Sequence, residues 1–352
     1  MILDKTLIFK VSPDLSQEDD IEKLSVAADI IKRGGNVCFP TETVYGLGAN
    51  ALCEKAVNDV FKAKGRPCDN PLIIHLDKIE NAENYCFAKE NTRLQKVLCF
   101  IPGPLTVILK KRECIPYNVT AGLENVAVRI PVNKVANKFL ELCGVPVAAP
   151  SANISGRPSP TSAQHVISDL DGKVDAIIDS GPCDVGVEST VITLEEDIPV
   201  LLRPGAVTFE MLTEKLGKVN VSSAILSEMK KGDVACAPGM KYKHYAPSSP
   251  DFLVTGEDEK VISFLSEKQE SENCAILCFS EDINKLYDKN LLCIGKKDAP
   301  IQQAQSIFSR LRETDALSVD KVYVHILNDK SGIRLAVFNR LLKASAFHII
   351  NV

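Results

Sequence analysis

Apolar residues near the start of the chain repeat with helical spacing. The residues that fall on one helical face are Ile21, Leu24, Ala28 and Ile31. Residues 16–19, with the sequence SQED, resemble a capping box, and Gly34 with Gly35 would end the helix. The pattern therefore predicts an amphipathic helix that is followed by a short strand at 36–39.

Helical and strand patterns then alternate as far as about residue 215. Helical spacing recurs at 54–63 and 133–143. Short apolar runs that are typical of strands occur at 72–76, 105–110, 126–130, 145–149, 176–178, 190–194 and 200–202. This order predicts a mixed α/β domain over residues 1–215.

A segment with little periodicity separates this domain from the rest of the chain. Residues 216–250 include the sequence APGMKYKHYAP at 237–247, and we interpret them as an interdomain linker. A passive tether would favour Gly and Ser, whereas this one places tyrosines, a histidine and lysines among prolines. The composition fits a lid over a site and also fits an ordered connector on the surface.

The last hundred residues again alternate between the two patterns. Strand patterns occur at 252–254, 275–279, 291–294 and 322–326, and helical patterns at 257–267, 302–312 and 332–343. A small open α/β domain is therefore expected over residues 251–352.

Composition and charge narrow the class of protein. The chain has 352 residues, of which 45% are hydrophobic and 25% charged, as in ordinary globular proteins, so disordered, collagenous and membrane classes are excluded. Its formal net charge of -5 has the wrong sign for a protein that grips nucleic acid through the phosphates. Any connection with RNA is therefore expected to be indirect.

The twelve cysteines show no metal-binding or disulfide pattern. No C-x-x-C pair occurs, and several cysteines, such as Cys38 and Cys278, lie inside apolar runs where they act as small hydrophobic residues. The N-terminus lacks the features of a secretion signal, and no run of about 18 apolar residues is present. These features predict a cytoplasmic protein that does not enter a membrane.

Common signatures of nucleotide binding and covalent catalysis are absent or weak. No Walker loop and no G-x-S-x-G elbow occurs, and the five histidines lack metal-ligand spacing. Residues 46–51 match G-x-G-x-x-A, but six residues separate them from the preceding predicted strand. We therefore interpret residues 46–51 as a turn that leads to the next helix.

Hydroxyls, amides and cations gather in segments that are too rich in Gly and Pro to form core. These segments are 40–46, 62–67, 69–71, 150–153, 159–161, 186–190 and 202–205. Any one of them alone is more often a turn or a helix cap. Together they provide the groups that hold a triphosphate, namely the cations Lys64, Arg66 and Arg203 and the neutral donors Asn70, Ser151, Asn153 and Ser159.

Arg129 stands at the end of an apolar strand pattern. A guanidinium at this position can form a bidentate pair with a substrate carboxylate, or a structural ion pair. The residues alone leave both interpretations open.

The motifs in these segments resemble those of the Sua5/YrdC family, specifically its two-domain Sua5 type. They are FPTETVYGLG at 39–48, KGR at 64–66, PGPLT at 102–106, SAN at 151–153, GVEST at 186–190 and RPG at 203–205. The similarity spans residues 10–210, and the linker sequence at 237–247 is also similar to that of the Sua5 type. The resemblance implies a YrdC-like twisted mixed sheet, then a linker and a smaller Rossmann-like domain.

The resemblance also implies a function and a set of site residues. The activity would be the ATP-dependent joining of L-threonine and bicarbonate into L-threonylcarbamoyladenylate, with release of pyrophosphate, as the first step of a tRNA modification. Threonine would be held by Thr43, His75, Arg129, Ser189 and the backbone at Ala149. ATP would be held by Arg66, Asn70, Asn125, Ser151, Asn153, Ser159, Arg203 and Tyr242. Lys64 and Arg66 would be catalytic.

This chemistry would need no nucleophile from the protein. The threonine amine would capture carbon dioxide or bicarbonate as a carbamate, whose oxygen attacks the α-phosphorus of ATP, and Mg²⁺ would be held by the phosphates. A separate transferase would receive the product, and direct tRNA binding would be weak or absent.

Two alternatives are weighed against this function. A non-catalytic RNA-binding module is disfavoured by the net charge. A carbamoyltransferase that acts on carbamoyl phosphate is disfavoured because the chain lacks the acylphosphatase and zinc-finger segments that usually accompany that activity.

Overall fold

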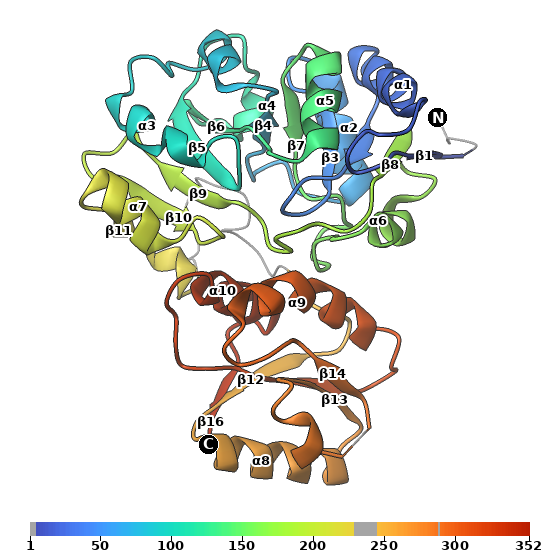
Figure 1. Ribbon diagram of the computed structural model, residues 1–352, viewed down its shortest axis with the longest axis vertical. Coiled ribbons are helices and arrows are strands. Elements are labelled where there is room, and N and C mark those ends of the chain that lie inside the picture. The colour runs from blue at the N-terminus through green and yellow to red at the C-terminus, as the bar shows by residue number, and fades with distance from the viewer. Residues whose placement is uncertain (1–4, 229–244, 288) are drawn as a thin grey trace.

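The computed structural model describes residues 5–228, 245–287 and 289–352. Within these ranges the chain forms two α/β domains, which lie one above the other in Figure 1. The N-terminal domain is built on a mixed sheet and the C-terminal domain on a parallel sheet. The predicted fold class is therefore confirmed.

An eleven-stranded mixed sheet forms the centre of the N-terminal domain. Its strands are β1 (Leu7–Lys10), β2 (Val37–Phe39), β3 (Gly46–Asn50), β4 (Ile73–His75), β5 (Leu105–Lys110), β6 (Asn125–Arg129), β7 (Val147–Ala149), β8 (Ala176–Asp179), β9 (Thr190–Thr193), β10 (Val200–Arg203) and β11 (Asn220–Val221). Their order in the sheet is β1-β8-β2-β3-β7-β4-β6-β5-β9-β10-β11. Parallel pairs such as β4 with β6 alternate with antiparallel pairs such as β3 with β7.

Seven α-helices pack around this sheet in the described part of the domain. They are α1 (Asp20–Lys32), α2 (Glu54–Lys64), α3 (Thr92–Val97), α4 (Tyr117–Thr120), α5 (Lys134–Cys143), α6 (Ala163–Leu170) and α7 (Phe209–Leu216), and short 3-10 turns occur at Ile79–Asn84, Leu98–Phe100 and Ser223–Ile225. The apolar face of α1 packs with that of α5 in one buried cluster, which includes Leu24, Ile31 and Phe139.

The predicted capping box before α1 is wrong. Ser16 does not cap the helix. Instead the carboxylate of Asp20 accepts hydrogen bonds from the backbone nitrogens of Ser12, at 3.1 Å, and Gln17, at 2.9 Å. Ile21 is 40% exposed, because the buried face of α1 runs through Leu24, Ala27, Ala28 and Ile31 and leaves Ile21 at its edge.

The segment that resembled a glycine-rich turn is strand β3, so the turn interpretation of residues 46–51 is wrong. It pairs antiparallel with β2, with Cys38 opposite Leu47. A Cβ on Gly48 would lie 2.7 Å from Cγ1 of Val147, so this glycine is needed for close packing inside the sheet.

Several short elements were not predicted. β1 is an edge strand whose apolar residues Leu7 and Ile8 are about half exposed, so it lacks the pattern of a buried strand. β11 and the 3-10 turn Ser223–Ile225 follow the predicted boundary at residue 215 and pack against β10. The boundaries at 215 and 250 stay predictions.

The C-terminal domain is a five-stranded parallel sheet with helices on both faces. Its strands are β12 (Asp251–Thr255), β13 (Cys274–Cys278), β14 (Leu291–Cys293), β15 (Lys321–His325) and β16 (Ile349–Asn351), and its helices are α8 (Asp258–Ser271), α9 (Pro300–Thr314) and α10 (Arg334–Ala344), with a 3-10 turn at Ile283–Lys285. The strand order is β14-β13-β15-β12-β16, and every pair is parallel. This arrangement confirms the predicted Rossmann-like organisation.

Two helices of the C-terminal domain face the N-terminal domain. Figure 1 shows α9 and α10 between the parallel sheet and the N-terminal domain, with α8 on the outer face. Val44 and Val187 of the N-terminal domain share a buried cluster with Phe308 of α9. Within the described residues, none of the helices is both long enough and apolar enough to cross a membrane.

Candidate functional site

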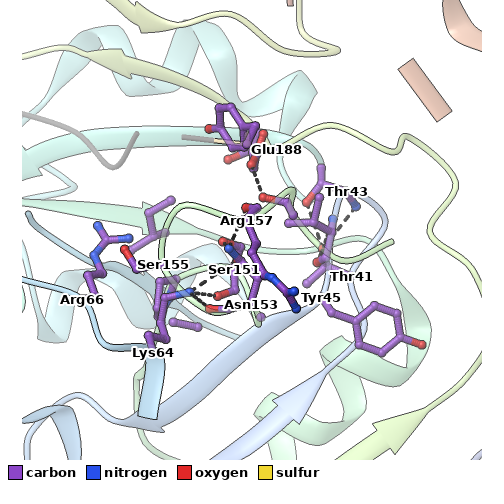
Figure 2. A pocket seen from close by; sticks show the side chains of 18 of the residues that line it. Thr41, Thr43, Tyr45, Lys64, Arg66, Ser151, Asn153, Ser155, Arg157 and Glu188 are labelled. Carbon is purple, nitrogen blue, oxygen red and sulfur yellow. Dashed lines mark hydrogen bonds between the residues drawn. The ribbon is translucent and has the colours of Figure 1, made fainter. Parts of the chain in front are cut away.

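A cleft opens on the N-terminal domain where strand ends and connecting loops meet (Figure 2). Several lining residues, including His75, Arg129 and Arg203, occupy the last position of their strands. Tyr245, which lies beyond the N-terminal domain in the sequence, also lines it. The cleft contains about 700 Å³ of space, part of which is open solvent.

Most of the candidate residues come together in this cleft. Those that line it are Thr43, Lys64, Arg66, His75, Arg129, Ala149, Ser151, Asn153, Ser159, Ser189 and Arg203. Asn70 does not, although its backbone oxygen lies 3.4 Å from Nη2 of Arg66. Asn125 begins the strand that Arg129 ends, so it lies roughly 13 Å away along β6. Tyr242 lies outside the described residues.

The loop between β2 and β3 is organised by a threonine. The hydroxyl of Thr41 donates to the carbonyl of Val44 at 2.6 Å and accepts from the backbone nitrogens of Thr43 and Val44 at 3.1 and 3.2 Å. The hydroxyls of Thr41 and Thr43 are 2.9 Å apart. These bonds fix a tight turn that presents Thr43 to the cleft.

Arg129 forms an ion pair within the protein, which is one of the two roles that the sequence left open for it. Its Nη2 lies 2.9 Å from Oε1 of Glu42, and both side chains are 4% exposed. Arg129 also lines the cleft, whereas Glu42 lies behind it. The guanidinium can therefore keep its internal partner and still face a bound carboxylate.

Lys64 points into a ring of oxygen atoms. Its ammonium donates to the carbonyls of Ser151 and Asn153 at 2.5 and 2.6 Å, and it lies 3.4 Å from Oδ1 of Asn153. Figure 2 shows Lys64 directed at these two residues. Burial, together with the nearby charge of Arg66, lowers the pKa of Lys64 well below its usual value. Lys64 thus ties the end of α2 to the loop that follows β7.

A second polar network joins Ser159 of the same loop to Glu188, and Arg203 to Ser189. Oε1 of Glu188 accepts a 2.5 Å hydrogen bond from the hydroxyl of Ser159. Nε and Nη2 of Arg203 donate to the carbonyl and hydroxyl oxygens of Ser189 at 3.0 and 3.1 Å. Burial raises the pKa of Glu188, but the charges of Arg340 and Arg203 outweigh it and lower the pKa to about 2. Glu188 is therefore a buried carboxylate that stays ionised.

Known protein families and curated relatives match this chain along almost its whole length. Residues 29–205 match the Sua5/YciO/YrdC family model, described as "Telomere recombination", and residues 207–346 match the model "Threonylcarbamoyl-AMP synthase, C-terminal domain". This chain belongs to the Sua5/YrdC family. A relative from Pyrococcus abyssi named "Threonylcarbamoyl-AMP synthase" is 46% identical, covering 94% of this chain and 96% of the relative. A relative of the same name from Bacillus subtilis is 39% identical over 97% of both chains.

A solved Sua5 structure has the same two-domain fold. The crystal structure of Pyrococcus abyssi Sua5 complexed with L-threonine superposes with a TM-score of 0.89 at 43% identity, and the match covers 99% of this chain and 100% of that one. The similarity therefore extends to both domains of the Sua5 type.

Several cleft residues of this Sua5 chain were not among the candidates, and Glu188 and Tyr245 are two of them. Glu188 lies inside the GVEST motif, where its position among hydroxyl residues was a usable signal. Tyr245 lies in the same linker sequence as Tyr242. It is buried, and its ring packs on Phe308 with a centroid distance of 5.1 Å. The sequence alone gave no reason to prefer one tyrosine.

His75 should make the stability of this Sua5 protein depend on pH. Burial, reinforced by Arg129, lowers the pKa of His75 to about 3. The unfolded chain then binds more protons than the folded chain between pH 6.5 and pH 3, so stability falls as the pH falls through this window. Between pH 7.5 and 5.5 we expect His75 to account for a loss of about 1.4 kcal/mol in the free energy of unfolding.

Urea unfolding at the two pH values measures this effect. In His75→Leu the loss should be smaller by about 1.4 kcal/mol, because leucine cannot take up a proton. His348→Gln, at an exposed position, is the control and should keep the wild-type pH dependence. An unchanged pH dependence in His75→Leu would contradict the prediction.

Proposed function

We propose that this chain is a threonylcarbamoyl-AMP synthase. It joins L-threonine, bicarbonate and ATP into L-threonylcarbamoyladenylate and releases pyrophosphate, which is the first step of N6-threonylcarbamoyladenosine formation at position 37 of tRNA. The observation that carries the proposal is the match over nearly the full length to relatives of that name. The residues gathered in the cleft support it.

The threonine subsite is proposed around Arg129. A guanidinium binds a carboxylate through two parallel hydrogen bonds, and Arg129 is held in place by Glu42. Thr43 and Ser189 provide hydroxyls on the same cleft, and Ala149 provides backbone. His75 is neutral at ordinary pH, so it can hydrogen-bond a ligand without repelling its ammonium group. This combination suits a small amino acid with a polar side chain.

Positive charge on the cleft wall supports a triphosphate ligand. Among the described residues of the wall, the cationic ones are Lys64, Arg66, Arg129, Arg157 and Arg203, against the single carboxylate of Glu188. Two of these arginines also pair with carboxylates that do not line the cleft, Arg129 with Glu42 and Arg157 with Asp169. The excess of positive charge is therefore smaller than the number of cationic residues suggests. Charged donors bind phosphate oxygens more strongly than neutral ones.

The neutral donors proposed for ATP lie beside these cations. Ser151 and Asn153 follow β7, and their side chains form a 2.5 Å hydrogen bond with each other. Ser159 lies on the same loop and is fully buried. We propose that ATP binds along this loop with Arg66 and Arg203 at its phosphates, and that Asn70, Asn125 and Tyr242 complete the subsite.

The reaction needs positioning more than covalent catalysis. Bicarbonate supplies carbon dioxide by losing hydroxide. The uncharged threonine amine adds to the carbon dioxide and loses a proton, which gives a carbamate. A carbamate oxygen then attacks the α-phosphorus of ATP, a new O–P bond forms, and the bond to pyrophosphate breaks. Lys64 and Arg66 would stabilise the negative charge that develops on the phosphate oxygens.

Mg²⁺ is proposed to arrive with ATP as part of the substrate. Among the described residues, no group of three His, Cys, Asp or Glu side chains could hold a metal ion. Glu188, the carboxylate that lines the cleft, is engaged by Arg340 and Ser159. Mg²⁺ commonly keeps several waters and binds substrate phosphates, so this cleft fits an ion that the phosphates carry.

The product requires an acceptor enzyme. L-Threonylcarbamoyladenylate is a mixed anhydride that hydrolyses in water, so we infer that a separate transferase takes it for tRNA modification, without tight tRNA binding by this chain. A cytoplasmic location is also inferred, because all the described cysteines are free, as expected in a reducing compartment.

Pyrophosphate release tests the proposed function. Purified protein is given ATP and Mg²⁺, with threonine and bicarbonate each present or omitted. We expect release only when both are present, with L-threonylcarbamoyladenylate identified by mass spectrometry. Release that ignores threonine, or no release, would mean that the substrate assignment is wrong.

A further inference from the structure

The C-terminal domain places an arginine inside the N-terminal domain. Arg340 lies on α10, and its side chain is completely buried, with 0% exposure. Its Nε lies 2.8 Å from Oε2 of Glu188, and its Nη2 donates to the carbonyl of the same residue at 3.2 Å. Its Nη1 donates to the carbonyl of Pro204 at 2.7 Å. One guanidinium therefore joins two segments of the N-terminal domain.

Both segments carry residues that line the cleft. Glu188 precedes Ser189, and Pro204 follows Arg203. The second carboxylate oxygen of Glu188 accepts the hydrogen bond from Ser159. Arg340 does not line the cleft itself. Its effect on a ligand must therefore pass through Glu188 and through the backbone beside Arg203.

The position of Arg340 is itself fixed. Its Nη1 donates to Oδ1 of Asn339 at 3.1 Å, and Nδ2 of Asn339 donates to the carbonyl of Ile225 at 2.7 Å. A buried guanidinium with this many oxygen partners has little freedom to rotate. Arg340 therefore forms a rigid buried connection between the two domains.

A second arginine of the C-terminal domain binds the loop that contains Ser159. Arg312 of α9 donates to the carbonyl of Pro158 at 2.6 Å and pairs with Asp169 at 2.8 Å. The same carboxylate also binds Arg157 of the loop. Arg312 of α9 thus contacts this loop directly, whereas Arg340 of α10 reaches it through Glu188 and Ser159.

We propose that Arg340 is a positioning residue for the ATP side of the cleft. It fixes Glu188 and the backbone at Pro204, so that Ser159 and Arg203 keep the arrangement that binds the triphosphate. This inference rests on the proposed function for its choice of ligand. It gives the C-terminal domain a direct part in building the site.

Calorimetric binding of a non-hydrolysable ATP analogue is the first measurement. In Arg340→Met the affinity for the analogue should fall about tenfold or more, whereas threonine affinity should change by less than about threefold. Four of the five threonine candidates, Thr43, His75, Arg129 and Ala149, make no hydrogen bond with Arg340 and should be spared. Ser189, which follows Glu188 in the chain, is the exception and accounts for the small loss of threonine affinity that is expected. Arg340→Lys keeps the charge but not the planar fork, and it should recover only part of the affinity.

Arg334→Lys is the matched control. Arg334 lies on the same helix, and its contacts are Asp329, at 2.7 Å, and the carbonyl of Lys297, at 3.0 Å, both within the C-terminal domain. This variant should bind both ligands as the wild type does. Wild-type affinity for the analogue in folded Arg340→Met would overturn the proposal.

A double variant covers the case in which Arg340→Met does not fold. Glu188→Met with Arg340→Met replaces the buried ion pair by apolar side chains, which proteins often tolerate. It should fold and still bind the analogue weakly, and wild-type affinity would again overturn the proposal. The pyrophosphate assay on the wild type separates this proposal from the proposed function. If the wild type shows no threonine-dependent release while the variants still lose affinity for the analogue, the proposed reaction is refuted but the positioning role of Arg340 stands.

Discussion

Replacing Lys64 by alanine is expected to lower turnover by about 100- to 1,000-fold while threonine affinity changes little. The ammonium of Lys64 holds the carbonyls of Ser151 and Asn153 and places a positive charge behind the loop proposed to bind ATP. Its loss would remove that charge and loosen the loop at once. The threonine candidates Thr43 and Arg129 make no hydrogen bond to Lys64, so threonine should still bind.

Steady-state kinetics and threonine calorimetry on Lys64→Ala test this expectation. Lys62→Ala is the control, because Lys62 belongs to the same helix but is exposed and paired with Asp59 on the surface. The control should retain full turnover. Equal losses of turnover and threonine affinity in Lys64→Ala would mean that Lys64 contributes to binding only. Thermal unfolding of each variant shows whether the protein remains folded.

The sequence located the cleft because its residues stand in short loops with a specific motif. Lys64, Ser151 and Arg203 are far apart in the chain, yet each lies directly after or at the end of a regular element, where strand and helix patterns can be read locally. Once the elements pack into one sheet, the loop residues at their ends meet. Local patterns were therefore sufficient to find most of the wall.

The parts that were missed depend on packing between distant segments. β3 reads as a turn because of its glycines, and only the neighbouring Phe39 and Val147 explain why larger residues would not fit. Arg340 sits within a predicted helical pattern at 332–343, but its partner Glu188 is 152 residues away. No local pattern pairs two such residues.

The net charge of the chain does not reveal the cleft either. The value of -5 averages over the whole chain, whereas the described part of the cleft wall concentrates five cations from four separate segments around one carboxylate. The total charge is informative about binding to an extended polyanion such as RNA. It says little about a small anion that is enclosed by a few residues.

Arg129→Met is expected to reduce threonine affinity by about 100-fold or more. The arginine is proposed to bind the threonine carboxylate, and removing one partner of a buried charged pair costs about 2–5 kcal/mol. Its loss also leaves the carboxylate of Glu42 buried without its ion-pair partner, so the free energy of unfolding should fall by about 3–5 kcal/mol. Two different effects are thus combined in one variant.

A second substitution separates them. Glu42→Gln combined with Arg129→Met removes the stranded charge, so stability measured by urea unfolding should recover most of its loss while threonine affinity stays low. Arg112→Met is the control, since its ion pair with Glu83 is partly exposed and neither residue lines the cleft. If the double variant binds threonine as tightly as the wild type, Arg129 serves only as the partner of Glu42, and the threonine carboxylate must be held by other groups in the cleft.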